Sequence, residues 1–265
     1  MENGYSLWLA SSISFENELK ILSIMREHQV DGMILAPLDA HHDEILDNLL
    51  RSLNHPENER LVLMDDPPEN CGQGVYQVIP DNVYAYQMAT NYLLSIGHRR
   101  IAFVGGFDKP NDRRYAATKR VNGYKMALSE HGLPADPTYI WMDGCEIEDG
   151  EKGFAQILGR GVLPTAVIAM SDQVAMGVAR MCAMQGLSIP RDISIIGCDD
   201  TFISRGLYPA LTSIDINPGL QGEMAVKVLI AVINGEAPPL VSTLSPKLII
   251  RASTARPSEA LIKAD

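Results

Sequence analysis

The segment from Pro164 to Asn217 limits the possible fold more than any other part of this sequence. Short apolar runs typical of buried strands occupy Thr165–Met170 and Ile193–Gly197. The residues between them repeat an apolar side chain at the spacing of one helix face, at Val174, Val178 and Met181. Gly186 follows that helix, at a position where helices commonly stop. Two buried strands joined by a helix are the building unit of a parallel sheet covered by helices.

Polar residues stand directly after both of these strands. Ser171 and Asp172 follow the first strand, and Asp199 and Asp200 follow the second. Open α/β sheets bind ligands outside the carboxyl ends of their strands, so a pocket is expected at this edge of the sheet. Ser171 and Asp172 are also suited to capping the helix that follows them, and Asp200 fits a turn. Asp172 is therefore either a ligand contact or a cap.

Strand and helix patterns alternate along the rest of the chain. We expect strands at Tyr5–Ala10, Gly32–Ala36, Arg60–Met64, Ile101–Val104 and Tyr139–Met142. We expect helices at about Ser14–His28, Asp43–Leu53, Asp81–Ile96, Lys119–His131 and Leu220–Ile233. Asp81 would cap the third of these helices, and Gly97 would end it. This alternation predicts the α/β class, with doubly wound parallel sheets.

Charge and cysteine content narrow the functions open to the chain. Lys and Arg total 22 against 33 Asp and Glu, a net charge of −11, so the chain carries no electrostatic footprint for nucleic acid of its own. The four cysteines show no CxxC spacing, which argues against metal or disulfide roles and favours a reducing cytosol. No apolar run approaches about 18 residues and no charged leader opens the chain, so neither a membrane span nor export is expected.

No motif supports catalysis. The HExxH, GxSxG and GxxxxGK[ST] patterns are all absent. Gly105-Gly106 supplies only two glycines of a dinucleotide fingerprint, and His41-His42 has no third metal ligand nearby. His98, in the turn before a strand, is expected to pack rather than to titrate. We therefore expect no catalytic residue, no metal and no cofactor, and a binding protein rather than an enzyme.

Six motifs occur in the order found in one protein family. They read VDGMILAP, GHRRIAFVGG, AMSDQVAMG, ISIIGCDDT, YPALTSID and LSPKLIIRAST. With these motifs the chain resembles the effector-binding domain of the lactose/galactose-repressor family, from Gly4 to Thr254. The resemblance implies the fold of type I periplasmic sugar-binding proteins, in which two doubly wound parallel-sheet lobes close on an effector.

The resemblance also implies how the chain divides. Three chain crossings would join a first lobe, at 1–79 plus 215–240, to a second lobe, at 80–214 plus 241–256. The remaining residues, 257–265, would form a frayed tail. Because family members usually dimerise, a homodimer is expected, and the cytoplasm is its expected location.

The first residues depart from the family pattern. GYSLWLASS matches the family's second strand, so the DNA-reading helix-turn-helix and the first strand are expected to be missing. That strand is central in the flavodoxin-like sheet order, and its loss would leave unpaired backbone groups at roughly 1–3 kcal/mol each. We interpret the sequence as a truncated gene model or fragment that cannot bind DNA as it stands. A rearranged lobe and a strand donated by a partner are the alternatives.

By resemblance, a small set of side chains is expected to contact the effector. Arg120 stands three residues before Gly123 in an RxxG motif whose arginine points into the cleft, where its fixed donors can fork across sugar hydroxyls or a carboxylate. Asp199 would accept hydrogen bonds from two neighbouring hydroxyls. The other candidates are Ser171, where sugar-responsive members often carry Asn, Asp172, and Asp65 at the end of the strand LVLMD.

Two departures from the family bear on the effector. Family members commonly stack an aromatic side chain on the effector ring, but the corresponding position here falls near Glu148, and no aromatic residue lies between Asp143 and Phe154. A purine is therefore less expected than a polar or charged effector. The loop before the RxxG motif is also more basic than usual, and its cations either meet an anionic group or are only solvated: Arg113, Arg114 and Lys119.

These observations predict the small-molecule sensing domain of a transcriptional regulator. Its effector would be a sugar, a sugar acid or a sugar phosphate, coupled to DNA binding through a separate module. The alternative is a stand-alone solute-binding protein for sugar transport.

Overall fold

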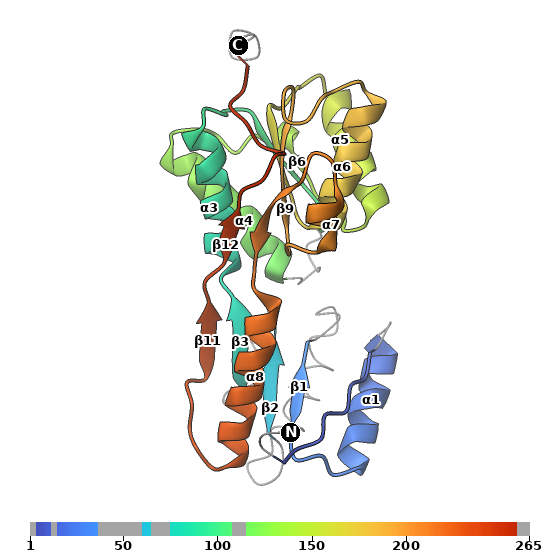
Figure 1. The fold of residues 1–265 in the computed structure, drawn as a ribbon, viewed down its shortest axis with the longest axis vertical. Coiled ribbons are helices and arrows are strands. Elements are labelled where there is room, and N and C mark those ends of the chain that lie inside the picture. Colours follow the sequence, from blue (N-terminus) through green and yellow to red (C-terminus); the bar gives the residue numbers. More distant parts are fainter. Residues whose placement is uncertain (1–3, 12–14, 37–59, 65–74, 108–114, 259–265) are drawn as a thin grey trace.

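The computed structural model describes residues 4–11, 15–36, 60–64, 75–107 and 115–258. Within these residues, the strands form a six-stranded sheet, a four-stranded sheet and a two-stranded pair. Figure 1 shows the six-stranded sheet in the upper half of the molecule and the four-stranded sheet in the lower half. The expected α/β fold with two doubly wound, mainly parallel sheets is confirmed.

The six-stranded sheet has the order β12-β10-β9-β8-β4-β6. Its neighbouring strands are parallel, except that β12 runs antiparallel to β10 at one edge. The strands are β4 (Ile101–Val104), β6 (Ile140–Trp141), β8 (Ala166–Ala169), β9 (Ser194–Cys198), β10 (Thr212–Asp215) and β12 (Lys247–Ile249). A short pair, β5 (Gly106–Phe107) and β7 (Asp143–Gly144), lies beside it, together with the 3-10 turn η1 (Pro137–Tyr139).

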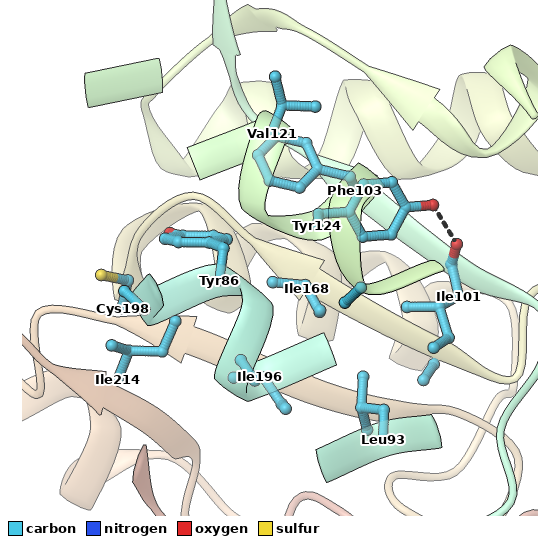
Figure 2. Packing of buried hydrophobic residues seen from close by; sticks show 14 of the residues in the cluster. Tyr86, Leu93, Ile101, Phe103, Val121, Tyr124, Ile168, Ile196, Cys198 and Ile214 are labelled. Carbon is cyan, nitrogen blue, oxygen red and sulfur yellow. Dashed lines mark hydrogen bonds between the residues drawn. The ribbon is translucent and has the colours of Figure 1, made fainter. Parts of the chain in front are cut away.

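Alternate side chains of β4 fill two separate cores, one on each face of this sheet. Ile101 and Phe103 pack on the face covered by α3 and α4, where the Tyr124 hydroxyl donates to the Ile101 carbonyl at 2.8 Å (Figure 2). Ala102 and Val104 pack on the face covered by α5 and α6. The helices are α3 (Asn82–Ser95), α4 (Tyr115–Glu130), α5 (Ile147–Gly159) and α6 (Asp172–Met184), with the short α7 (Phe202–Gly206) after β9. Strands buried on both faces explain the continuous apolar runs of the sequence.

The four-stranded sheet is parallel throughout, in the order β1-β2-β3-β11. Its β2 strand alternates in the same way: Leu61 and Leu63 pack with Leu22 of α1, whereas Val62 packs with Ala225 of α8. The elements are α1 (Phe15–Glu27), β1 (Met33–Leu35), β2 (Leu61–Met64), β3 (Tyr76–Pro80), α8 (Pro218–Ile233) and β11 (Val241–Leu244). We call this sheet with α1 and α8 lobe one, and the six-stranded sheet with its helices lobe two.

The chain crosses between the lobes three times, and Figure 1 shows all three connections. It passes from β3 to α3, from β10 to α8, and from β11 to β12. Because β3 ends at the crossing into lobe two and β10 ends at the crossing into lobe one, the carboxyl ends of the two parallel sheets face each other. The predicted boundary at residue 240 falls too early, because β11 at Val241–Leu244 pairs with β3 in lobe one.

Most predicted elements are confirmed within one to four residues. The β4 strand has the predicted bounds, and α3 carries the predicted cap, because the Asp81 side chain accepts from the Tyr84 backbone N–H at 2.9 Å. Gly97 ends that helix with a φ of +106°. The α4 helix begins at Tyr115, four residues before the predicted start at Lys119. The predicted helix at Asp43–Leu53 lies outside the described residues.

The predicted strand at Tyr5–Ala10 is wrong, since these residues pair with no strand in the described part of the chain. Leu7 and Leu9 are instead 83% and 91% exposed. Apolar alternation favours a strand only where a sheet edge accepts it, because a strand has no hydrogen bonds of its own. The apolar pattern alone therefore did not establish a strand at these residues.

The α5 helix was missed because glycines interrupt its pattern. A side chain at Gly150 would overlap the Val174 carbonyl of α6, and one at Gly153 would overlap the Trp141 ring. These glycines let α5 pack closely on α6 and β6, and tertiary contact outweighs their low helix propensity.

No helix in the described ranges has the length and apolar character that a bilayer span requires.

His98 packs in the core, as the sequence indicated, and fixes the chain after β12. It is 1% exposed, and its Nε2 lies 2.9 Å from the Ala255 carbonyl, which can only accept. Nε2 therefore carries the proton, and Nδ1 accepts from the Thr165 hydroxyl at 2.9 Å. Ala255 also accepts from the Ser194 hydroxyl, so the chain is held beyond Thr254.

We expect His98 to make stability depend on pH. Burial lowers the pKa of His98 below 6.5, so between its folded and unfolded pKa values the unfolded chain binds more protons. The stabilisation is complete well above pH 6.5 and is lost as the pH falls toward the folded pKa, by at most about 1.4 kcal/mol per pH unit. In urea unfolding at pH 7.5 and pH 6.0, His98→Gln should lose less stability on acidification than the wild type. An equal loss in both proteins would contradict this assignment.

Candidate functional site

Polar and charged groups gather at the carboxyl ends of β8 and β9, the edge of lobe two that faces lobe one. Ser171 follows β8, and Asp199 and Asp200 follow β9. Both aspartates have positive φ angles, +94° and +44°, a conformation that residues other than glycine rarely adopt. The backbone thus turns sharply at the end of β9 and begins α7 two residues later.

Arg120 reaches this edge from α4 and is held there by several contacts. Only 8% of the residue is exposed. Its Nε donates to Asn82 Oδ1 at 2.9 Å, and its Nη1 donates to the Met170 carbonyl at 2.8 Å. The guanidinium carbon lies 5.7 Å from the centre of the Tyr86 ring, within the range of a cation–π contact. The side chain is therefore fixed before any ligand arrives.

Gly123 explains why this arginine belongs to an RxxG motif. A side chain at Gly123 would overlap the Val83 carbonyl of α3, so only glycine allows α4 to pack this closely on α3. One turn earlier on α4, Arg120 then lies against Asn82 and Tyr86, which α3 supplies. The glycine sets the distance between the helices, and the distance brings the arginine to the strand ends.

Among the described residues, Asp199 forms an ion pair with this arginine. Arg120 Nη2 lies 3.9 Å from Asp199 Oδ1, and the side chains are 10% and 32% exposed respectively. A pair at this separation and exposure adds little to folding stability, because water screens it. Asp199 also accepts a weak hydrogen bond from the Cys198 thiol at 3.4 Å. The structure thus presents a cation and an anion side by side at an accessible edge.

The neutral groups behind this pair were missed by sequence reasoning. Tyr86 and Cys198 are fully buried, and the Tyr86 hydroxyl donates to the Met170 carbonyl at 2.8 Å. Burial raises the pKa of Tyr86 and the pKa of Cys198 well above their ordinary values, so both stay neutral. A buried neutral thiol is a poor nucleophile. Tyr86 lies within an ordinary apolar helix pattern, and nothing local in the sequence marks it as part of a site.

Ser171 caps α6, as the sequence suggested, and lies at the strand ends where a ligand contact is expected. Its hydroxyl accepts from the Val174 backbone N–H at 3.2 Å and so caps α6. The side chain is half-buried, and a capping hydroxyl retains its own proton as a donor. Ser171 can therefore cap the helix and donate toward a ligand at the same time.

Asp172, expected as either a ligand contact or a cap, is a buried structural carboxylate. It is 1% exposed, so it presents no surface to a ligand. Its Oδ2 accepts from the Thr201 backbone N–H at 2.7 Å and from the Thr201 hydroxyl at 2.9 Å, and its Oδ1 accepts from the Ser213 hydroxyl at 2.6 Å. Burial raises the pKa of Asp172, although these hydrogen bonds oppose the shift. The structure favours a structural role over a ligand contact, because both oxygens already join α6 to the start of α7 and to β10.

Asp200 serves the turn, as expected. Its Oδ1 accepts from the Ser204 hydroxyl at 2.8 Å and from Arg251 Nη2 at 2.6 Å. Arg251 also donates to the Leu211 carbonyl at 2.8 Å. These bonds fix the start of α7 and leave Asp199 as the more exposed carboxylate of the turn, with 32% of its side chain exposed against 18% for Asp200.

The remaining candidates lie apart from this cluster or outside the described residues. Asp65, Arg113 and Arg114 lie outside the described residues. Lys119 is half-buried on α4, and Glu148 is exposed in the first turn of α5. Among the residues that the structure describes, no group of three or more His, Cys, Asp and Glu side chains could hold a metal ion.

Comparison with known proteins gives a consistent assignment. A family model described as a periplasmic binding protein-like domain matches residues 90–254. The HTH-type transcriptional repressor PurR of Pasteurella multocida is 32% identical, over 94% of this chain and 72% of the relative. The ribose operon repressor of Haemophilus influenzae is 30% identical, over 95% of this chain and 73% of the relative. A solved complex of the transcriptional regulator CelR with cellobiose has a TM-score of 0.81 at 28% identity, covering 95% of this chain and 74% of that one.

Proposed function

The chain belongs to the LacI family of transcriptional regulators, as its periplasmic-binding-protein-like, effector-binding part, and we propose that its effector is a sugar or a sugar derivative. A binding domain of this family is not an enzyme, and its relatives are regulators.

The Arg120–Asp199 pair is the observation that carries this proposal. Asp199 can accept from two neighbouring hydroxyls, and Arg120 can donate to ring or hydroxyl oxygens, which is the complementary pattern that a polyhydroxylated ligand needs. Ser171 adds a hydroxyl donor beside them. Two of the similar proteins also point to saccharides: one is a ribose operon repressor, and one was solved with cellobiose.

A ligand between the facing strand ends would bind the closed arrangement of the lobes better than the open one. Only such a difference in affinity can shift the balance of conformations, since equal affinity for both would change nothing. The closed state would then pass its effect to a DNA-binding module. Asp65 of lobe one remains a proposed contact from the opposite side.

We expect a matching sugar to raise the melting temperature of this chain by about 5–10 °C at a hundredfold excess over its Kd. Differential scanning fluorimetry with cellobiose, ribose, glucuronate and glucose 6-phosphate is a suitable first panel. Asp199→Asn should weaken binding of the effective sugar at least tenfold, which is roughly the effect of losing one charge-assisted hydrogen bond. Asp192→Asn, at the amino end of the same strand, should leave the shift unchanged.

Each shift is measured from the unliganded melting temperature of the same variant, so any change in basal stability is subtracted. If no saccharide stabilises the wild type, the sugar proposal is contradicted. If Asp199→Asn and Asp192→Asn respond equally, the assignment of Asp199 is contradicted while the sugar class stands.

The other family-based expectations stay predictions. Homodimerisation is one, and the strongly exposed Phe202 and Tyr208, at 81% and 100%, offer aromatic surface for such a contact. Cytoplasmic location is another. The stand-alone transport protein is the less favoured alternative, because the similar proteins are transcriptional regulators.

A further inference from the structure

Lobe two contains a cavity at the edge of its sheet. The cavity, of about 350 Å³, lies between α4 and the segment around η1 and β6. Its lining residues are Phe107, Thr118, Val121, Asn122, Lys125, Ala135, Pro137, Ile140 and Met142. The volume falls in the range of ordinary small-molecule sites, roughly 300–1,000 Å³.

The position of α4 accounts for this cavity. Gly123 draws α4 onto α3, and β6 is the outermost strand on that side of the sheet. The flank of α4 that faces away from α3 therefore stands beside an edge strand of this sheet. Val121 and Ile140, from the two walls, both pack at the margin of the core beneath.

The two walls differ in chemistry. The α4 wall presents Thr118, Asn122 and Lys125, which recur at helical spacing and are exposed. The opposite wall is apolar, with Ile140 and Met142 half-buried in it. Asp136 lies in the same segment as this apolar wall, but it is not among the residues that line the cavity. Its Oδ1 accepts a hydrogen bond from the Thr138 backbone N–H at 2.8 Å. Lys125 is thus the charged side chain that lines the cavity.

We propose that this cavity binds a small aromatic carboxylate, as a site separate from the Arg120–Asp199 cluster. The ring would lie against Ile140, Met142 and Phe107, and the carboxylate would accept from Lys125, with Asn122 and Thr118 as further donors. One apolar wall opposite a short polar stripe with a single cation matches a ligand with one apolar body and one negative charge. A neutral saccharide has too little apolar surface for this wall, so the ligand class differs from that of the cleft.

Phenylacetate and its neutral counterpart phenylacetamide test this site in the full chain. Titration by ligand-observed NMR should show that phenylacetate binds about tenfold more tightly than phenylacetamide, as expected for one charge-assisted contact. Lys125→Met should reduce the affinity for phenylacetate to that for phenylacetamide. Lys247→Met removes an exposed lysine from β12, at the opposite edge of the same sheet, and should have no effect.

A second variant tests the location without touching the core. Thr118 is an exposed residue of the cavity lining, and Thr118→Trp should fill the space and abolish binding of both compounds while the fold is kept. The proposal is overturned if phenylacetate does not bind the wild type, if Lys125→Met and Lys247→Met bind it equally, or if Thr118→Trp still binds it. Because saccharide binding is measured separately, failure here leaves the proposed function intact.

Discussion

Replacing Asp172 with alanine is expected to lower the free energy of unfolding by about 3–5 kcal/mol, a large part of the roughly 5–15 kcal/mol typical of a folded domain. The Asp172 carboxylate accepts three hydrogen bonds, two from Thr201 and one from Ser213. Truncation would leave those donors buried without an acceptor and open a cavity between α6 and α7. Urea unfolding followed by circular dichroism measures the loss directly.

Asp172→Asn is the matched control for this change. The amide keeps the size and one acceptor oxygen, which can still serve Thr201, so the expected loss is only about 1 kcal/mol. It also removes a buried charge whose desolvation raises the pKa of Asp172. If alanine and asparagine destabilise the protein equally, or if alanine is tolerated, the structural role assigned to this carboxylate is wrong.

Gly123→Ala is expected to be the second large perturbation, with a loss of about 3 kcal/mol from overpacking. The added methyl group would overlap the Val83 carbonyl, and a backbone oxygen cannot rotate away as a side chain can. Separation of α4 from α3 would also withdraw Arg120 from Asn82, so the protein that still folds should bind the effective saccharide more weakly. Chemical denaturation and saccharide titration of the same preparation measure both effects.

Gly222→Ala provides the comparison within α8. A side chain there would meet nothing within 4 Å, so alanine should stabilise the helix by up to about 1 kcal/mol. Opposite signs for the two substitutions would separate close helix packing from helix propensity. A mild effect of Gly123→Ala would mean that α3 and α4 tolerate a wider spacing than the structure shows.

Features that depend on neighbouring residues, such as helix caps and buried strands, were predicted well from the sequence. Asp81 and Ser171 cap their helices through backbone groups only three residues away, and a bond of that range is visible in a short stretch of sequence. The buried strands β4 and β9 were predicted from continuous apolar runs. Such runs occur because helices cover both faces of their sheet. Fold class followed from the order of these elements rather than from any one of them.

Contacts between distant positions were not predictable in the same way. Asp172 looked like a helix cap or a ligand contact because its true partners, Thr201 and Ser213, follow it by 29 and 41 positions. Tyr86 was overlooked because the carbonyl that it binds lies 84 positions later. Arg120 and Asp199 could be paired only through the family resemblance, since neither spacing nor composition connects α4 with the turn after β9.

The three crossings between the lobes have a consequence for the nascent chain. β1, β2 and β3 leave the ribosome early, but the helix and strand that complete their sheet, α8 and β11, come after residue 217. Val62 and Val78 gain their α8 partners Ala225 and Val228 only then, whereas every strand of lobe two except β12 is already synthesised. During translation the sheet of the first-made lobe thus stays uncovered by α8 until most of the chain has been made, and its apolar face is the surface that a cotranslational chaperone would meet.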